Sequence, residues 1–245
     1  MNKPKIVSRE EWLEARKLHL ANEKRLTRLY DQLAAERRRL PWVKLDKKYV
    51  FEAPEGRVTL AELFDRRSQL IVNHFMLGPG SEAGCVGCSF GADHVNAGLV
   101  HLEQRDVRYV AVSRAPLAEI ERFKARMGWS FRWVSSHGSD FNYDFHVSFT
   151  KEELARGTIY YNFAEQPVHY PSEDLQGTSV FYRDEAGDVF HTYSSYARGG
   201  EGVLATYACL DLTPRGRDEH GPTQTLGDWV RHHDSYGKEP APTRH

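Results

Sequence analysis

Two cysteines separated by two residues, Cys85 and Cys88, are the part of this sequence whose types and spacing are suited to chemistry. They follow an apolar run at residues 70–77, typical of a strand, and a turn rich in Gly and Pro. We expect Cys85 to open a helix, where unpaired backbone N–H groups and the helix dipole stabilise a thiolate and lower its pKa. Cys88, one turn later, is then close enough to displace a mixed disulfide from Cys85. The pattern predicts a nucleophilic Cys85 and a resolving Cys88.

The same pair is open to two other interpretations. Thiolates and imidazoles together bind zinc or copper, and His74 and His169 are the histidines that would complete a metal site with the two cysteines. Alternatively, the thiols are incidental and the chain is a non-catalytic binding module. We expect no cofactor under the redox interpretation, and copper or zinc under the metal interpretation. Cys209, between two apolar residues, is expected to be a buried and inert thiol.

The composition excludes some classes of partner. Lys and Arg number 33 against 34 Asp and Glu, so the net charge of -1 gives no field that would attract nucleic acid or an anionic membrane. No apolar run reaches the length of a membrane span, and the N-terminus lacks the apolar core of a signal peptide. We therefore expect a cytoplasmic protein that binds neither nucleic acid nor membrane. In a reducing compartment, such a cysteine pair is more often catalytic or metal-binding than structural.

Elements that must position the cysteines alternate between strand and helix. Strands are expected at 107–113 and about 131–135, separated by a helix that starts at Pro116 and is closed by Gly128, and this order implies parallel strands. Hairpins are expected at 43–60 and at 179–193. Residues 136–177 interleave aromatic and polar side chains, which predicts either a pocket wall or a cap over the sheet. A last helix at 201–212 is expected to cover the sheet.

A long helix is predicted at the N-terminus. Ser8 and Glu11 form a capping box, and the helical pattern runs to about Arg39, where Pro41 ends it. Its apolar stripe requires a partner surface, either its own domain or a second copy of the chain in a homodimer. We divide the chain into a helical extension (1–41), an α/β domain (42–213, with an insertion at about 136–177) and a C-terminal tail (214–245), in which only 229–233 are expected to be anchored.

Four segments carry a resemblance to a known family, namely residues 85–90, 112–116, 138–145 and 229–234. They resemble a bacterial thioredoxin-like family of unknown function, related to the peroxiredoxin-type (alkyl hydroperoxide reductase and thiol-specific antioxidant) branch of the thioredoxin fold. The resemblance implies a three-layer α/β sandwich with a central mixed sheet, a long N-terminal helix and an extended C-terminal tail. It names no reaction. Unlike thioredoxins, the chain has Val86 and Gly87 between the cysteines and no proline at 177–179.

We therefore predict a thiol–disulfide oxidoreductase or a thiol-dependent reductase that uses Cys85 and Cys88. Its substrate is expected to be a small-molecule or protein thiol or disulfide, and a cellular thiol reductant would regenerate the dithiol. Polar side chains in the segments that carry the resemblance are predicted to bind the substrate: Arg114, Asp140, Asn142 and Tyr143.

Overall fold

The structure is a computed structural model that describes residues 4–168 and 172–237. It divides into two units, Met1–Pro41 and Trp42–His245. The first unit contains α1 (Arg9–Arg37), and Ser8 caps it: the Ser8 hydroxyl accepts from the Glu11 N–H at 3.2 Å, and the Glu11 carboxylate accepts from the Ser8 N–H at 3.1 Å. The predicted capping box and long helix are confirmed. No residue of α1 is buried.

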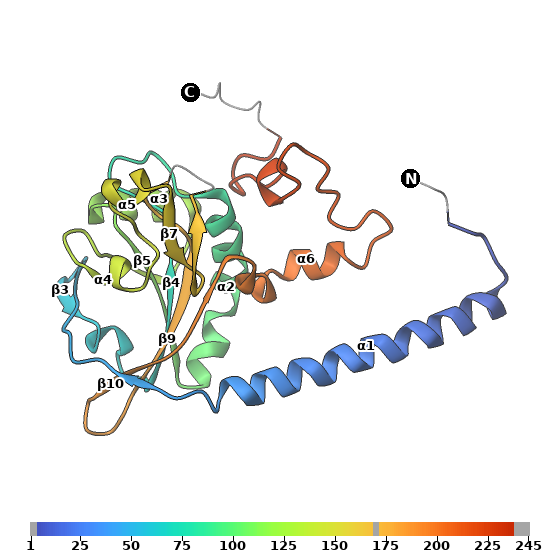
Figure 1. The fold of residues 1–245 in the computed structure, drawn as a ribbon, viewed down its shortest axis with the longest axis horizontal. Coiled ribbons are helices and arrows are strands. Elements are labelled where there is room, and N and C mark those ends of the chain that lie inside the picture. The colour runs from blue at the N-terminus through green and yellow to red at the C-terminus, as the bar shows by residue number, and fades with distance from the viewer. Residues whose placement is uncertain (1–3, 169–171, 238–245) are drawn as a thin grey trace. The chain divides into compact units, whose positions relative to one another are not determined.

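An eight-stranded mixed sheet forms the centre of the second unit (Figure 1). The strand order is β1-β10-β9-β4-β5-β6-β2-β3. The strands are β1 (Val43–Lys44), β2 (Val50–Ala53), β3 (Gly56–Thr59), β4 (Gln69–His74), β5 (Val107–Ser113), β6 (Arg132–Ser135), β9 (Gly177–Arg183) and β10 (Val189–Tyr196). A short 3-10 helix, η1 (Glu62–Phe64), links β3 to β4.

Strand β4 lies in the middle of the sheet, between β9 and β5. It runs parallel to β5 and antiparallel to β9, while β5 runs parallel to β6 and β9 antiparallel to β10. Helix α2 (Val86–Gln104) connects β4 to β5, and α3 (Leu117–Met127) connects β5 to β6. Two parallel strands joined by the helix that begins after Cys85, with an antiparallel hairpin beyond the first strand, make a thioredoxin-like fold. The predicted fold class is confirmed.

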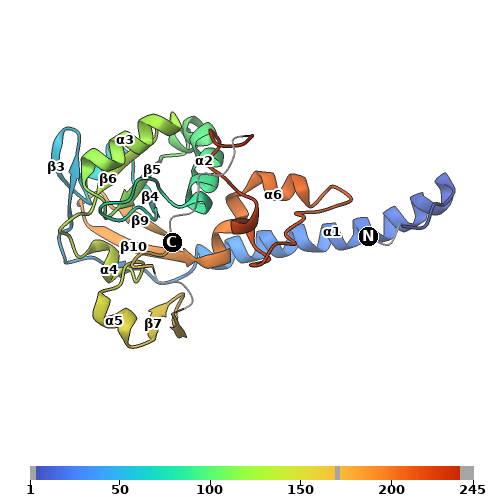
Figure 2. The ribbon, with the colours of Figure 1, turned by 90° about the horizontal axis from the view of Figure 1, so that it is seen from above.

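The two faces of the sheet bury separate apolar clusters, because side chains alternate along each strand. Leu70 and Val72 of β4 belong to a cluster that also contains Phe141 and Phe181. Phe75, immediately after β4, belongs to a second cluster, which includes residues of α2 and α3. Figure 2 shows α2 and α3 on one side of the sheet and α4, α5 and β7 on the other. The cysteines therefore belong to the α2/α3 side.

The irregular segment 136–177 covers the opposite side. It contains α4 (Phe141–Asp144), α5 (Lys151–Ala155) and a small hairpin of β7 (Thr158–Tyr161) and β8 (Ala164–Pro167). Phe141, Phe145 and Phe149 from this segment are buried in the cluster on that face. Their aromatic rings, which did not fit a helical or strand period in the sequence, cap the sheet.

Helix α6 and the segment after it pack on α2, whereas a helix covering the sheet was expected. After η2 (Ala197–Val203), the helix α6 is shorter than predicted, Ala205–Leu210, and η3 (Leu226–Asp228) follows. Leu204 and Tyr207 form a cluster with Phe90 of α2 and with Val230. The expectation that Cys209 is buried is wrong: Cys209 is exposed. Among the described residues, no helix combines the length and the apolar character needed to cross a bilayer.

Candidate active site

The turn between β4 and α2 delivers Cys85 to the N-terminus of the helix. The Cys85 N–H donates to the Met76 carbonyl at 3.0 Å, which folds the turn back on the end of the strand. Gly84 makes this close approach possible, because a Cβ at this position would clash with the Phe75 ring and lie 2.8 Å from Cε1 of Phe123. Cys85 is the N-cap residue of α2, as predicted, and uses no side-chain hydrogen bond as a cap.

The two thiols are inequivalent. They are free, and they lie 4.0 Å apart. The Cys88 S–H donates to Cys85, and together with the backbone N–H groups of Cys88 and Gly87 it lowers the pKa of Cys85 to about 6, although burial opposes the shift. The pKa of Cys88 is raised, because its proton is held by Cys85 and because it is buried. At neutral pH, the half-buried Cys85 is therefore a thiolate and the buried Cys88 a thiol.

Arg114 and Tyr143, two of the residues predicted to bind substrate, are brought together beside the cysteine turn. Arg114 follows β5 and donates from Nε and Nη2 to the two Asp174 oxygens at 2.6 and 2.9 Å, from Nη2 to Glu173 at 3.1 Å, and from Nη1 to the Tyr143 hydroxyl at 3.0 Å. Asp174 also accepts from the Ser148 hydroxyl at 2.6 Å. The Arg114 side chain is thus largely saturated by protein partners.

The Arg114–Asp174 ion pair lies against the turn that carries Cys85. A Cβ at Gly78 of this turn would lie 2.9 Å from Oδ2 of Asp174 and 3.9 Å from Nη2 of Arg114. The Asp174 carboxylate also contributes to the raised pKa of Cys88, which puts its charge within electrostatic reach of that thiol. The hydrogen bond to Cys85 and burial are the main causes that keep the proton on Cys88, and the Asp174 carboxylate adds a smaller effect in the same direction.

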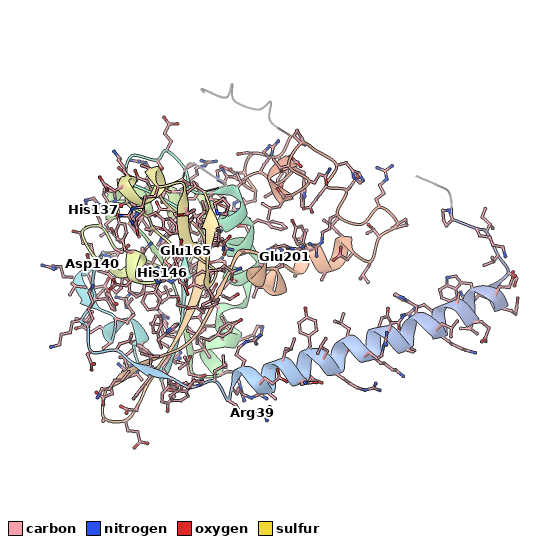
Figure 3. The ribbon with its side chains drawn as sticks, viewed as in Figure 1. Arg39, His137, Asp140, His146, Glu165 and Glu201 are labelled. Atoms are coloured by element: carbon pink, nitrogen blue, oxygen red, sulfur yellow. The ribbon has the colours of Figure 1, made fainter. Side chains whose placement is uncertain are left out.

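The other two residues predicted to bind substrate lie in different surroundings. Asn142 is buried, and its side-chain oxygen accepts from the Ser136 hydroxyl at 3.0 Å. Its backbone carbonyl accepts from the N–H of Ser148 at 3.2 Å, so Asn142 supports the serine that binds Asp174. Asp140 accepts from Lys47 at 2.9 Å. It lies at the α4 edge of the unit, away from the C-terminal segment that follows α6 (Figure 3).

His74 lies on the opposite face of the sheet from the thiols. It is 1% exposed, its Nε2 is 2.9 Å from the Ser179 hydroxyl, and its ring stacks with Phe141 and Phe145. Burial lowers its pKa to about 3. Within the described part of the chain, no three His, Cys, Asp or Glu residues are arranged to hold a metal ion. The structure therefore does not bring His74 to Cys85 and Cys88, and His169 lies outside the described residues.

Several residues at this site were not predicted from the sequence. Asp174 and Ser148 lie in the irregular segment, where no periodic pattern indicates which side chains point inward. Leu226 and His232 come from the C-terminal segment. The sequence did single out residues 229–233 as anchored, and the structure bears this out: His232 Nε2 donates to the Gly84 carbonyl at 2.8 Å. Nothing in the sequence indicated that this segment is attached at Gly84, the residue before Cys85.

The fold and the site together define a thioredoxin-like protein with a Cys-x-x-Cys pair at the N-terminus of the helix after its central strand. Residues 1–236 match the family described as "Bacterial protein of unknown function (DUF899)", and the chain belongs to that family. No curated protein matches the chain.

The chain is similar to several solved structures of peroxiredoxins. Peroxidoxin BcpB from Mycobacterium tuberculosis is 13% identical, with 70% of this chain and 97% of that chain covered and a TM-score of 0.44. Peroxiredoxin Q from Xanthomonas campestris is 15% identical, with 65% and 88% covered and a TM-score of 0.42. The mitochondrial 2-Cys peroxiredoxin from Plasmodium falciparum is 14% identical, with 67% and 88% covered and a TM-score of 0.36.

Proposed function

We propose that this protein is a thiol-dependent oxidoreductase in which Cys85 is the nucleophile and Cys88 the resolving thiol. The observation that carries the proposal is the position of Cys85 at the N-terminus of α2, 4.0 Å from Cys88, where the Cys88 thiol and the backbone N–H groups of Cys88 and Gly87 lower its pKa. These donors favour the thiolate, which is the reactive form of a cysteine. The same contacts leave Cys88 protonated and therefore unreactive until Cys85 has been consumed.

The reaction proposed is thiol–disulfide exchange. The Cys85 thiolate attacks one sulfur of a disulfide substrate, the substrate S–S bond breaks, and a mixed disulfide with Cys85 forms while one substrate thiolate leaves. Cys88 then loses its proton and attacks the Cys85 sulfur, which releases the second substrate thiol and leaves a Cys85–Cys88 disulfide. Two electrons pass from the dithiol to the substrate. A cellular thiol reductant returns them by the reverse exchange.

Arg114 and Asp174 support this division of roles. The carboxylate is near Cys88 and helps to keep it protonated, while the guanidinium binds the carboxylate through two hydrogen bonds and fixes its position. Because the Arg114 donors are mostly used within the protein, we propose that Arg114 positions the site and is not itself the main substrate contact. Substrate binding by Asp140 and Asn142 stays a prediction.

The proposal is tested with Ellman's reagent, a small aromatic disulfide whose released thiol is coloured. In a Cys209→Ser background, the reduced protein should release two coloured thiols per chain and end with an internal disulfide. Cys88→Ser should release one and retain a mixed disulfide on Cys85, seen by intact mass. Cys85→Ser should react slowly. If Cys85→Ser reacts as fast as its parent, Cys85 is not the nucleophile and the proposal is wrong.

A further inference from the structure

The C-terminal segment Leu226–Ser235, which we call the strap, passes beside the N-terminal turns of α2. Figures 1 and 2 both show the C-terminal part of the chain next to this helix. Val230 is fully buried against Phe90, and the Trp229 ring contacts Phe90 edge-on with centroids 5.7 Å apart. The strap is thus packed on α2 by an apolar contact, which orders it although most of its backbone lies outside regular secondary structure.

Polar contacts hold the strap at the cysteine turn. His232 donates to the Gly84 carbonyl at 2.8 Å, and its ring contacts the Phe123 ring at 5.3 Å between centroids. Asp234 accepts from Arg126 at 2.9 and 3.0 Å. Because Gly84 directly precedes Cys85, the strap is attached to the same turn that delivers the nucleophile.

Leu226 extends from the strap over the first turn of α2. A Cβ placed at Gly87 would lie 3.0 Å from Cδ1 of Leu226 and 3.7 Å from the Cys85 sulfur. The Leu226 side chain and the Cys85 sulfur therefore both lie close to the backbone of Gly87, which carries no side chain. A reagent that approaches the thiolate from this side passes between Leu226 and the first turn of α2, a route that we call the passage.

From this geometry, we propose that the strap restricts Cys85 to small-molecule substrates, with Leu226 as the residue that sets the size limit. The inference rests on the proposed function, because it concerns access to the same thiolate. Exchange with a protein disulfide brings the partner's backbone close to the attacking sulfur, on the side where Leu226 lies. A low-molecular-weight disulfide presents its sulfur without a folded chain around it and fits the passage. The substrate class is therefore a small disulfide or a comparably small oxidant, and not a folded protein.

The test compares two alkylating reagents of equal chemistry and different size, iodoacetamide and 5-iodoacetamidofluorescein, on the reduced full-length protein. The rate at each cysteine is followed by peptide mass spectrometry, and the exposed Cys209 is the reference within the same chain. The ratio of small-reagent to bulky-reagent rates should be larger at Cys85 than at Cys209 by about tenfold or more, because the bulky reagent reacts only when the strap opens. This ratio does not depend on the thiolate fraction, which is the same for both reagents.

Two variants should move the ratio in opposite directions. Leu226→Ala should accelerate bulky labelling of Cys85 several-fold with little effect on iodoacetamide, and Gly87→Ala should retard bulky labelling because its new methyl group occupies the passage. Leu212→Ala, at a leucine that is 86% exposed, is the matched control and should change neither rate.

Equal ratios at Cys85 and Cys209 in the unmodified protein would overturn the inference, and so would a Leu226→Ala ratio equal to that of the parent. These outcomes are separate from failure of the proposed function, which would appear as iodoacetamide labelling of Cys85 with no preference over Cys209 at any pH. If Leu226→Ala does not fold, as judged by circular dichroism, Gly87→Ala tests the inference instead. Slower bulky labelling of Cys85 in Gly87→Ala would support it, and unchanged or faster labelling would overturn it.

Discussion

The lowered pKa of Cys85 makes a quantitative prediction for its pH–rate profile. With a pKa of about 6, Cys85 is half thiolate at pH 6 and fully thiolate at pH 9, so its alkylation rate should rise only about twofold over this range. A cysteine with the ordinary pKa of about 8.5 would accelerate by about 200-fold over the same interval. The sign follows from the donors around the sulfur: they stabilise the anion, so the reactive form persists to lower pH.

The absolute rate contains a second, opposing effect. Lowering a thiol's pKa by about 2.5 units also reduces the nucleophilicity of its thiolate, by about 10- to 20-fold for a Brønsted coefficient of about 0.4–0.5. Relative to an ordinary cysteine, Cys85 should then react about tenfold faster at pH 6 and about tenfold slower at pH 9. The strap leaves Cys85 open to a reagent as small as iodoacetamide, so the midpoint of the labelling profile reports the thiolate fraction.

The assay is iodoacetamide labelling between pH 5 and 9, read for each cysteine by peptide mass spectrometry, with Cys209 as the exposed reference. Cys88→Ala is the informative variant, because it removes the S–H donor that lowers the Cys85 pKa most. Its midpoint should rise but stay below 8.5, since the backbone N–H groups of the helix remain. Equal labelling of Cys85 and Cys209 from pH 6 to 9, or a Cys85 rate that rises about tenfold per pH unit through this range, would refute the reasoning.

Three further predictions concern stability and assembly. Asp174→Asn should lower the free energy of unfolding in urea by about 3–5 kcal/mol, because it leaves the nearly buried Arg114 without its carboxylate. Glu173→Gln, at a side chain that is 40% exposed, should lower it by less than about 1 kcal/mol. Equal losses would contradict the interpretation that Asp174 is the main partner of Arg114. Gly84→Ala should destabilise by about 1–3 kcal/mol through overpacking, while Gly98→Ala in α2, where a Cβ meets nothing within 4 Å, should stabilise by up to about 1 kcal/mol. Deleting residues 1–41 should convert a homodimer to a monomer in size-exclusion chromatography with light scattering, since the apolar residues of α1 are unburied; a full-length monomer would argue against pairing through α1.

The features that the sequence predicted correctly depend on residues close to one another along the chain. The apolar strand, the glycine-containing turn and the helix after Cys85 follow from residue types within a few positions of one another, and so does the order of parallel strands. The Cys209 error came from neglecting helical geometry. Its neighbours are apolar, but the buried residue of α6 is Tyr207, and two positions along a helix rotate the side chain by about 200°. Cys209 therefore points away from the surface that Tyr207 contacts.

The histidine candidates show a related limit. His74 and Phe75 are adjacent, so in an extended chain they point to opposite faces. The turn after β4 folds toward the face of Phe75, and this choice depends on contacts with α3 that no local pattern records. Likewise, Asp174 is 60 residues from Arg114 in the sequence, within a segment without periodicity. The Arg114–Asp174 ion pair beside the cysteine turn could therefore be found only in three dimensions.

Three glycines near Cys85 connect these local and long-range levels. Gly78 and Gly84 lie in the turn and Gly87 lies in the first turn of α2, and the structure gives each a separate steric partner. Gly78 lies against Asp174, Gly84 against the rings of Phe75 and Phe123, and Gly87 against Leu226. The ion pair, the aromatic core and the strap thus approach the Cys85 segment at points where its backbone has no side chain. A methyl group would therefore disturb a different feature at each glycine. At Gly78 it would disturb the Asp174 carboxylate, at Gly84 the placement of Cys85, and at Gly87 the access to the Cys85 sulfur.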